Sequence, residues 1–138
     1  MNKRILSSIF VVLLLVASVF SVQAADLEPP VSPDPLSPYT GVTSAGAGLS
    51  RLNNGNAQVT GSINLKPGYR ANATLALYKE GSTSPVASWS QSSTFIWISQ
   101  SYSVPSGYTY YVSLAATVYD SNDNYVDSVN IESNHVHF

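Results

Sequence analysis

The only two histidines of the chain, His135 and His137, stand two positions apart at its end. In a strand such a pair lies on one face, so the two imidazole groups could bind zinc or copper together. A zinc site needs three or four protein ligands, and the sequence indicates no third ligand. We therefore expect solvent-facing side chains on a final edge strand, and we predict no metal and no cofactor.

Catalysis requires a positioned acid, base or nucleophile, and this chain offers few candidates. It has no cysteine and no Gly-x-Ser-x-Gly elbow for a serine nucleophile. Glycoside hydrolysis would need two carboxylates that face each other. Asp127 and Glu132 are five positions apart, so in a strand they would point to opposite faces. We predict no catalytic residue and a protein that is not an enzyme.

The segment Asp120-Ser121-Asn122-Asp123-Asn124 is rich in side-chain oxygens, as calcium loops are. It lacks the glutamate at the spacing that an EF-hand requires, since the next one is Glu132. Asp and Asn also form tight turns, because their side chains accept hydrogen bonds from the backbone that follows. We expect a hairpin turn here.

Aromatic side chains are the more informative group, with nine tyrosines and two tryptophans in the chain. If Ile96, Ile98, Tyr102 and Val104 face a core, the residues between them face outward. The same reasoning applies to a second strand, which we expect to be its neighbour. Exposed rings can stack on sugars or contact a protein partner. The predicted binding residues are Phe95, Trp97, Tyr111 and Tyr119. A shift of one residue would reverse the pattern and place Trp89 or Trp97 in the core.

The N-terminus has the features of a secretory signal. Lys3 and Arg4 precede an apolar run from Ile9 to Phe20, and Val22 and Ala24 suit cleavage after Ala24. The run is shorter than the roughly 20 apolar residues of a membrane-spanning helix. We predict a signal peptide at 1–24, an extracellular protein, and no membrane association after cleavage.

Residues 25–45 contain five prolines and few apolar side chains, which predicts a disordered linker. The remaining segment, 46–138, is the predicted domain. After the signal the chain has only four scattered basic residues, namely Arg51, Lys66, Arg70 and Lys79. Nucleic acid and anionic membranes require clustered basic residues, so both are excluded as partners.

Apolar and polar residues alternate over 57–65, 72–77 and 108–118, the last including Tyr108, which is typical of half-buried strands. Turn-forming residues separate these runs at 53–56, 66–68, 81–82, 105–107 and 121–124. No apolar helical period persists, so no helix of consequence is expected. About seven short strands at this spacing predict an all-β protein, an antiparallel β-sandwich without disulfides.

Residues 105–116, Pro-Ser-Gly-Tyr-Thr-Tyr-Tyr-Val-Ser-Leu-Ala-Ala, resemble the sixth strand of fibronectin type III and related immunoglobulin-like domains. In that resemblance Tyr110 takes the tyrosine-corner position, with a buried ring and a hydroxyl bonded back to the preceding turn. The span from Leu49 to Asn134 also resembles an uncharacterised group of small exported Gram-positive proteins. These resemblances imply an immunoglobulin-like or fibronectin-like sandwich outside the cell, and no known activity.

The patterns together predict a secreted, non-enzymatic binding domain that recognises carbohydrate or a surface protein through its exposed aromatic residues. Two alternatives stay open. One is a self-associating protein of an extracellular matrix, because uncharged aromatic strands favour edge-to-edge pairing. The other is a secreted antibacterial factor or toxin.

Overall fold

The computed structural model describes residues 37–138, which form eight strands and no helix. The strands are β1 (Val42–Arg51), β2 (Ala57–Leu65), β3 (Arg70–Lys79), β4 (Ala87–Ser93), β5 (Phe95–Tyr102), β6 (Thr109–Tyr119), β7 (Tyr125–Glu132) and β8 (Val136–His137). Within this range no helix could cross a membrane. The predicted signal peptide and residues 25–36 of the predicted linker lie outside the described residues.

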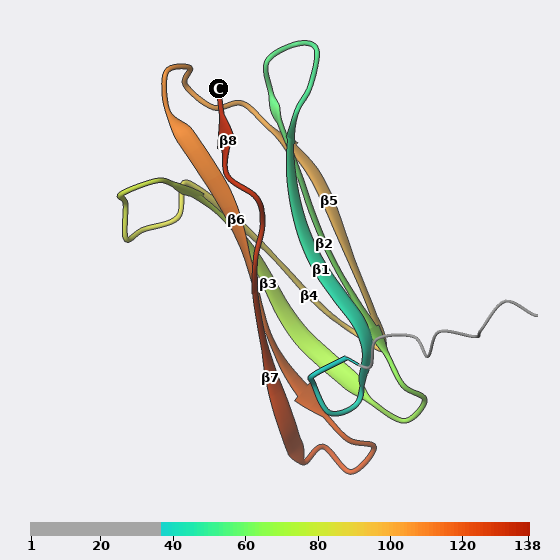
Figure 1. The fold of residues 1–138 in the computed structure, drawn as a ribbon. Coiled ribbons are helices and arrows are strands. Elements are labelled where there is room, and N and C mark those ends of the chain that lie inside the picture. The colour runs from blue at the N-terminus through green and yellow to red at the C-terminus, as the bar shows by residue number, and fades with distance from the viewer. Residues whose placement is uncertain (1–36) are drawn as a thin grey trace, which may run out of the picture. The chain divides into compact units, whose positions relative to one another are not determined.

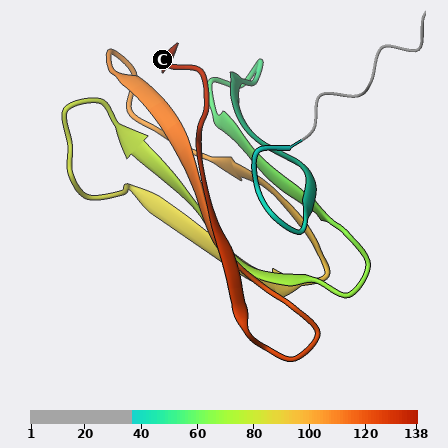
Figure 2. The same ribbon diagram turned by 60° about the horizontal axis from the view of Figure 1, so that its bottom comes forward.

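The strands form two antiparallel sheets that pack face to face (Figure 1). One is three-stranded, in the order β1-β2-β5. The other is five-stranded, in the order β4-β3-β6-β7, with β8 paired to the start of β6. The prediction of an all-β antiparallel sandwich is confirmed. β4 and β5 follow each other in the sequence but belong to different sheets. The chain passes from β4 through Thr94 directly into β5 of the other sheet (Figure 2).

The first strand begins earlier than expected. Val42 is buried and pairs with Leu65, so placing residues 42–45 in a disordered linker was wrong. Further contacts tie the preceding residues to β7, since the Tyr39 hydroxyl donates to the carbonyl oxygen of Asn130 and the Thr40 amide donates to Asp127. The five prolines before this segment led us to predict the start of the domain too late in the sequence.

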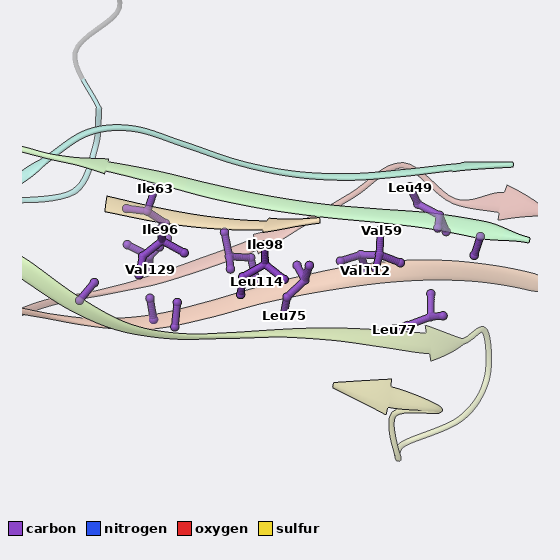
Figure 3. Packing of buried hydrophobic residues seen from close by; sticks show 14 of the residues in the cluster. Leu49, Val59, Ile63, Leu75, Leu77, Ile96, Ile98, Val112, Leu114 and Val129 are labelled. Carbon is purple, nitrogen blue, oxygen red and sulfur yellow. The ribbon is translucent and has the colours of Figure 1, made fainter. Parts of the chain in front are cut away.

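The core lies between the sheets, where alternate side chains of facing strands interdigitate (Figure 3). Alternation arises because successive residues of a strand point to opposite faces. The three-stranded sheet contributes Leu49, Val59, Ile63, Ile96 and Ile98. The five-stranded sheet contributes Leu75, Leu77, Val112, Leu114 and Val129. The predicted inward residues of 57–63 and 73–77 are all buried, which confirms the register of both strands.

Gly61 faces inward on β2 and has no side chain because Leu75 of the opposite sheet fills its place. A Cβ atom on Gly61 would lie 2.8 Å from Leu75 Cδ1 and 3.3 Å from Leu114 Cδ1. Such distances force neighbouring atoms to move. The small residue therefore allows the two sheets to approach at this level of the core.

Tyr110, the second residue of β6, makes the contacts predicted for it. Its ring is buried, and its hydroxyl donates to the carbonyl oxygen of Pro105 at 3.2 Å. Burial raises the pKa of this phenol, and the neighbouring Tyr108 raises it further. The buried ring of Phe138 meets the Tyr110 ring edge-on, with centroids 5.6 Å apart. The end of the chain is thus docked into the sandwich.

Two aromatic residues expected in the core lie elsewhere. Tyr108 is exposed, because the left-handed Gly107 turns the chain before β6 begins, and Lys79 Nζ lies 3.4 Å above its ring. Tyr102 lies at the open side of the sandwich, by which we mean the side where the edge strands β4 and β5 face each other. There its ring meets Trp89 edge-on, with centroids 6.0 Å apart. Trp89 itself packs partly buried against the core.

The 120–124 segment is the predicted hairpin turn between β6 and β7. Asp120 accepts hydrogen bonds from the backbone N–H groups of Asn122 and Asn124, and Asp123 has a φ of 64°. Hydrogen bonds from the backbone and side chain of Asn124, followed by that from Asn122, lower the pKa of Asp120. The turn geometry accounts for the oxygen-rich composition.

Candidate functional site

The outer face of the three-stranded sheet carries small polar side chains and two aromatic rings. Pairing of β1, β2 and β5 places alternate residues of each strand side by side on this face. We name it the aromatic face. Its residues are Ser44, Gly46, Gly48 and Ser50 on β1, Gln58, Thr60, Ser62 and Asn64 on β2, and Phe95, Trp97, Ser99 and Ser101 on β5. None of these side chains is charged.

Phe95 and Trp97 project from this face, as predicted, with 51% and 57% of their surface exposed. Two positions apart on one strand, they are separated by about 7 Å along β5. Their cross-strand partners are Asn64 and Ser62 on β2, which are much smaller. Among residues 37–138, neither ring is stacked on another aromatic ring or on a cation. Both rings are therefore available to a ligand.

Hydrogen bonds along the face hold its polar side chains in place. Asn64 Nδ2 donates to Ser44 Oγ at 2.7 Å, and Gln58 Nε2 donates to Ser99 Oγ at 2.8 Å. Each bond links neighbouring strands and fixes a carboxamide group near the sheet surface. The face therefore presents ordered hydrogen-bonding groups beside its two rings.

Trp97 also borders a cleft of about 420 Å³ at the open side of the sandwich, between β4 and β5. The cleft is lined by Trp89, Ser90, Gln91, Ile98, Ser99 and Gln100 as well. The backbone N–H of Trp97 donates to Gln91 Oε1 at 2.9 Å, which joins the edge strands of the two sheets. The two tryptophans thus have different surroundings. Trp89 packs against the core, and Trp97 faces solvent.

The other two predicted binding residues do not belong to this surface. Tyr111 and Tyr119 lie on β6, which is in the five-stranded sheet, whereas β5 pairs only with β2. The prediction that the two strands are neighbours was wrong. Period-two alternation tells which residues face outward but not which sheet a strand joins. The four residues therefore lie on opposite outer faces of the sandwich.

Neighbouring side chains also cover the ring faces of Tyr111 and Tyr119. Tyr111 is stacked between Tyr78, at 5.4 Å, and His135, at 4.8 Å between centroids. The guanidinium carbon of Arg70 lies 4.5 Å above the Tyr119 ring. Stacking of a ligand on these rings would require the present partners to leave.

His135 lies between two glutamates, with Nε2 2.9 Å from Glu132 Oε1 and Nδ1 3.3 Å from Glu80 Oε1. The hydrogen bond with Glu132, more than that with Glu80, raises the pKa of this imidazole. His137 instead contacts Thr109 Oγ1 at 3.2 Å. In the described part of the chain, no three or more histidine and carboxylate side chains are placed to hold a metal ion.

A second hollow, of about 600 Å³, lies on the outer face of the five-stranded sheet. Two cross-strand rows of small residues form it, and we name it the polar trough. The rows are Ser90, Thr74, Ala115 and Asn130, and Ser92, Asn72, Thr117 and Ser128. Sequence reasoning missed this site. Its signal is the run of serines at alternate positions of β4, which becomes informative only once the register with β3 is known.

The chain matches no known protein-family model and no curated protein.

Proposed function

We propose that the protein is a secreted, non-enzymatic binding domain that recognises neutral polysaccharide through the aromatic face. The observation that carries the proposal is the pair of exposed, unstacked rings of Phe95 and Trp97 on a face without charge. Sugar rings expose C–H groups on their faces, which pack on aromatic rings. Their hydroxyl groups donate and accept hydrogen bonds, as the Ser, Thr, Asn and Gln side chains beside the rings do.

The absence of charge favours a neutral ligand. Anionic polymers would require cations for pairing, and the residues of the aromatic face offer none. An exposed aromatic pair also suits a protein partner. The Gly and Ser residues on β1, however, do not extend the two rings into the larger apolar centre that a protein interface buries. We therefore favour polysaccharide.

The location and the sandwich type belong to the same proposal. The N-terminal charges, apolar run and cleavage motif support export, with a Gram-positive bacterium as the source. The three-plus-four arrangement of long strands and the Tyr110 corner support an immunoglobulin-like or fibronectin-like sandwich.

Retention on insoluble polysaccharide tests the function. Purified protein would be mixed with cellulose, chitin and cell-wall peptidoglycan, and the bound fraction measured. We expect retention on at least one of them, weakened about tenfold or more by Trp97→Ala or Phe95→Ala. Tyr108→Ala is the matched control, because it removes an exposed ring away from the aromatic face. Absence of retention on all three, or equal retention of both variants and the wild type, would contradict the proposal.

Self-association is a second candidate, favoured by one observation. No charged residue occurs from Gly81 to Tyr119, a segment that contains β4 and β5, one edge strand of each sheet. Edge strands of monomers usually carry charges that block pairing with another chain. If edges pair, light scattering should show concentration-dependent assembly that Ser101→Lys on β5 prevents and Ser50→Lys on β1 does not. A monomer at every concentration would exclude this candidate.

A further inference from the structure

We infer that the polar trough is a second binding site, which holds a neutral oligosaccharide lying across the strands of the five-stranded sheet. The trough is on the opposite side of the sandwich from the aromatic face, so this site is independent of the proposed one. The shape of the trough, its hydrogen-bonding groups and its lack of charge support this site.

The shape follows from the order of small and large residues along each strand. Outward positions of β6 read Tyr111, Ser113, Ala115, Thr117 and Tyr119, so large rings bound a run of small side chains. Each ring has large companions across the sheet. Tyr111 stacks with Tyr78 and His135, and Tyr119 pairs with Arg70 and Tyr125. The Tyr119 row borders the two small rows, which form the floor, on one side. On the other side a third row, Ser88, Ala76 and Ser113 with Glu132 at its β7 end, lies between the floor and the Tyr111 row.

The dimensions suit a chain of sugars. The floor crosses four strands, from β4 to β7, which corresponds to about 14 Å at the usual strand spacing. Its two rows lie about 7 Å apart, because each strand contributes residues two positions apart. An elongated hollow of this size accommodates a short segment of a linear chain.

Seven of the eight floor residues carry hydrogen-bonding side chains, the exception being Ala115. Ser92 Oγ donates to Asn72 Oδ1 at 2.8 Å, and Arg70 Nη1 donates to the same oxygen at 3.3 Å. These two donors orient the carboxamide, so its NH₂ group points away from them and can donate to a ligand. Thr74 and Ser90 share a hydrogen bond at 3.0 Å. The floor is thus an ordered array of donors and acceptors.

None of the eight floor residues is charged, and the lining of the hollow is more polar than apolar. The nearest cation, Arg70, is held by Asp123 at 2.8 Å and by the Tyr119 ring. An anionic ligand would find no free counter-charge, and an apolar ligand would desolvate many polar groups at a cost. The hydroxyl groups of a neutral sugar need no counter-charge, and they can form hydrogen bonds with the polar groups of the floor.

Tyr125 supplies a ring at the β7 end of the trough. It is the most exposed large aromatic residue among residues 37–138, at 62%, and its hydroxyl lies 3.2 Å from Ser128 Oγ. A sugar that occupies the floor near Ser128 can pack against this ring.

Chemical-shift mapping by NMR tests the site, with soluble hexasaccharides as probes: β-1,4-linked glucose, β-1,3-linked glucose, α-1,4-linked glucose and β-1,4-linked N-acetylglucosamine. We expect at least one probe, at millimolar concentration, to shift the amide signals of Thr74, Ala115 and Asn130. No shifts with any probe, or shifts confined to the aromatic face, would overturn the inference.

Ala115→Tyr fills the centre of the trough at an exposed position, and we expect it to weaken binding of that probe about tenfold or more. Asn72→Ala, also exposed, should weaken it by a smaller factor. Asn53→Tyr, at an exposed position of the turn between β1 and β2, is the matched control and should leave binding unchanged. Unaltered binding by Ala115→Tyr would also overturn the inference.

Trp97→Ala separates this inference from the proposed function. It should weaken retention on insoluble polysaccharide about tenfold or more and leave the trough shifts intact. If the wild type bound a soluble probe in the trough but no insoluble polysaccharide, only the proposed function would fail.

Discussion

The Tyr110 hydroxyl donates to the carbonyl oxygen of Pro105, five residues earlier and 3.2 Å away. The ring that closes one end of the core therefore also fixes the turn that leads into β6. This contact links the loop between β5 and β6 to the strand at the centre of the five-stranded sheet.

Tyr110→Phe removes this hydrogen bond and keeps the ring. We expect the free energy of unfolding to fall by about 1 kcal/mol, the usual contribution of such a bond. Urea denaturation measures the change, and Tyr108→Phe at an exposed position is the control. Equal stability of the Tyr110→Phe variant and the wild type would show that the corner bond contributes nothing.

Phe138→Ala should cost more, about 3 kcal/mol, because it removes a buried ring in contact with Tyr110. Thermal unfolding followed by circular dichroism measures the change. The exposed neighbour His137→Ala should alter stability by less than about 0.5 kcal/mol. A Phe138→Ala variant as stable as the His137→Ala variant would argue against docking of the chain end.

Gly61→Ala should destabilise the sandwich by about 1–3 kcal/mol, because the added methyl group meets Leu75 and Leu114. Gly46→Ala on β1 is the matched control. Its methyl group would come no closer than 4.0 Å to Ser62 Oγ, so it should be neutral or slightly stabilising. Urea denaturation measures both variants, and equal stability of the two would contradict this prediction.

Stability should also depend on the protonation of His135. Its pKa in the folded protein is raised above the ordinary value of 6.5 by Glu132 and Glu80. The stabilisation is therefore complete below pH 6.5 and is lost as the pH rises through the folded-state pKa. Urea midpoints should fall from mildly acidic to mildly alkaline buffer, and His135→Gln should reduce that fall. An NMR titration that placed the pKa of His135 below 6.5 would contradict this prediction.

Alternation within a strand was readable from the sequence because burial repeats every second residue. It gave the limits of β2 and the outward direction of Phe95 and Trp97. β1 was partly missed, since its Ser, Gly and Ala residues supply almost no apolar contrast. The pairing of Trp97 with Ser62 in one sheet, and of Tyr111 with Tyr78 in the other, depends on contacts between distant segments that no local pattern encodes.

The polar trough illustrates the same limit. Ser90, Thr74, Ala115 and Asn130 come from four separate strands and become neighbours only through register. Each alone is an ordinary outward residue of an antiparallel strand. Only their alignment creates a hollow with a continuous set of hydrogen-bonding groups.

The uncharged stretch from Gly81 to Tyr119 has a consequence for the conditions under which the protein can work. Attraction between ions weakens as dissolved electrolyte accumulates, whereas packing of rings and exchange of hydrogen bonds with water respond to it far less. The proposed binding of polysaccharide should therefore be about equally strong in fresh water and in brine.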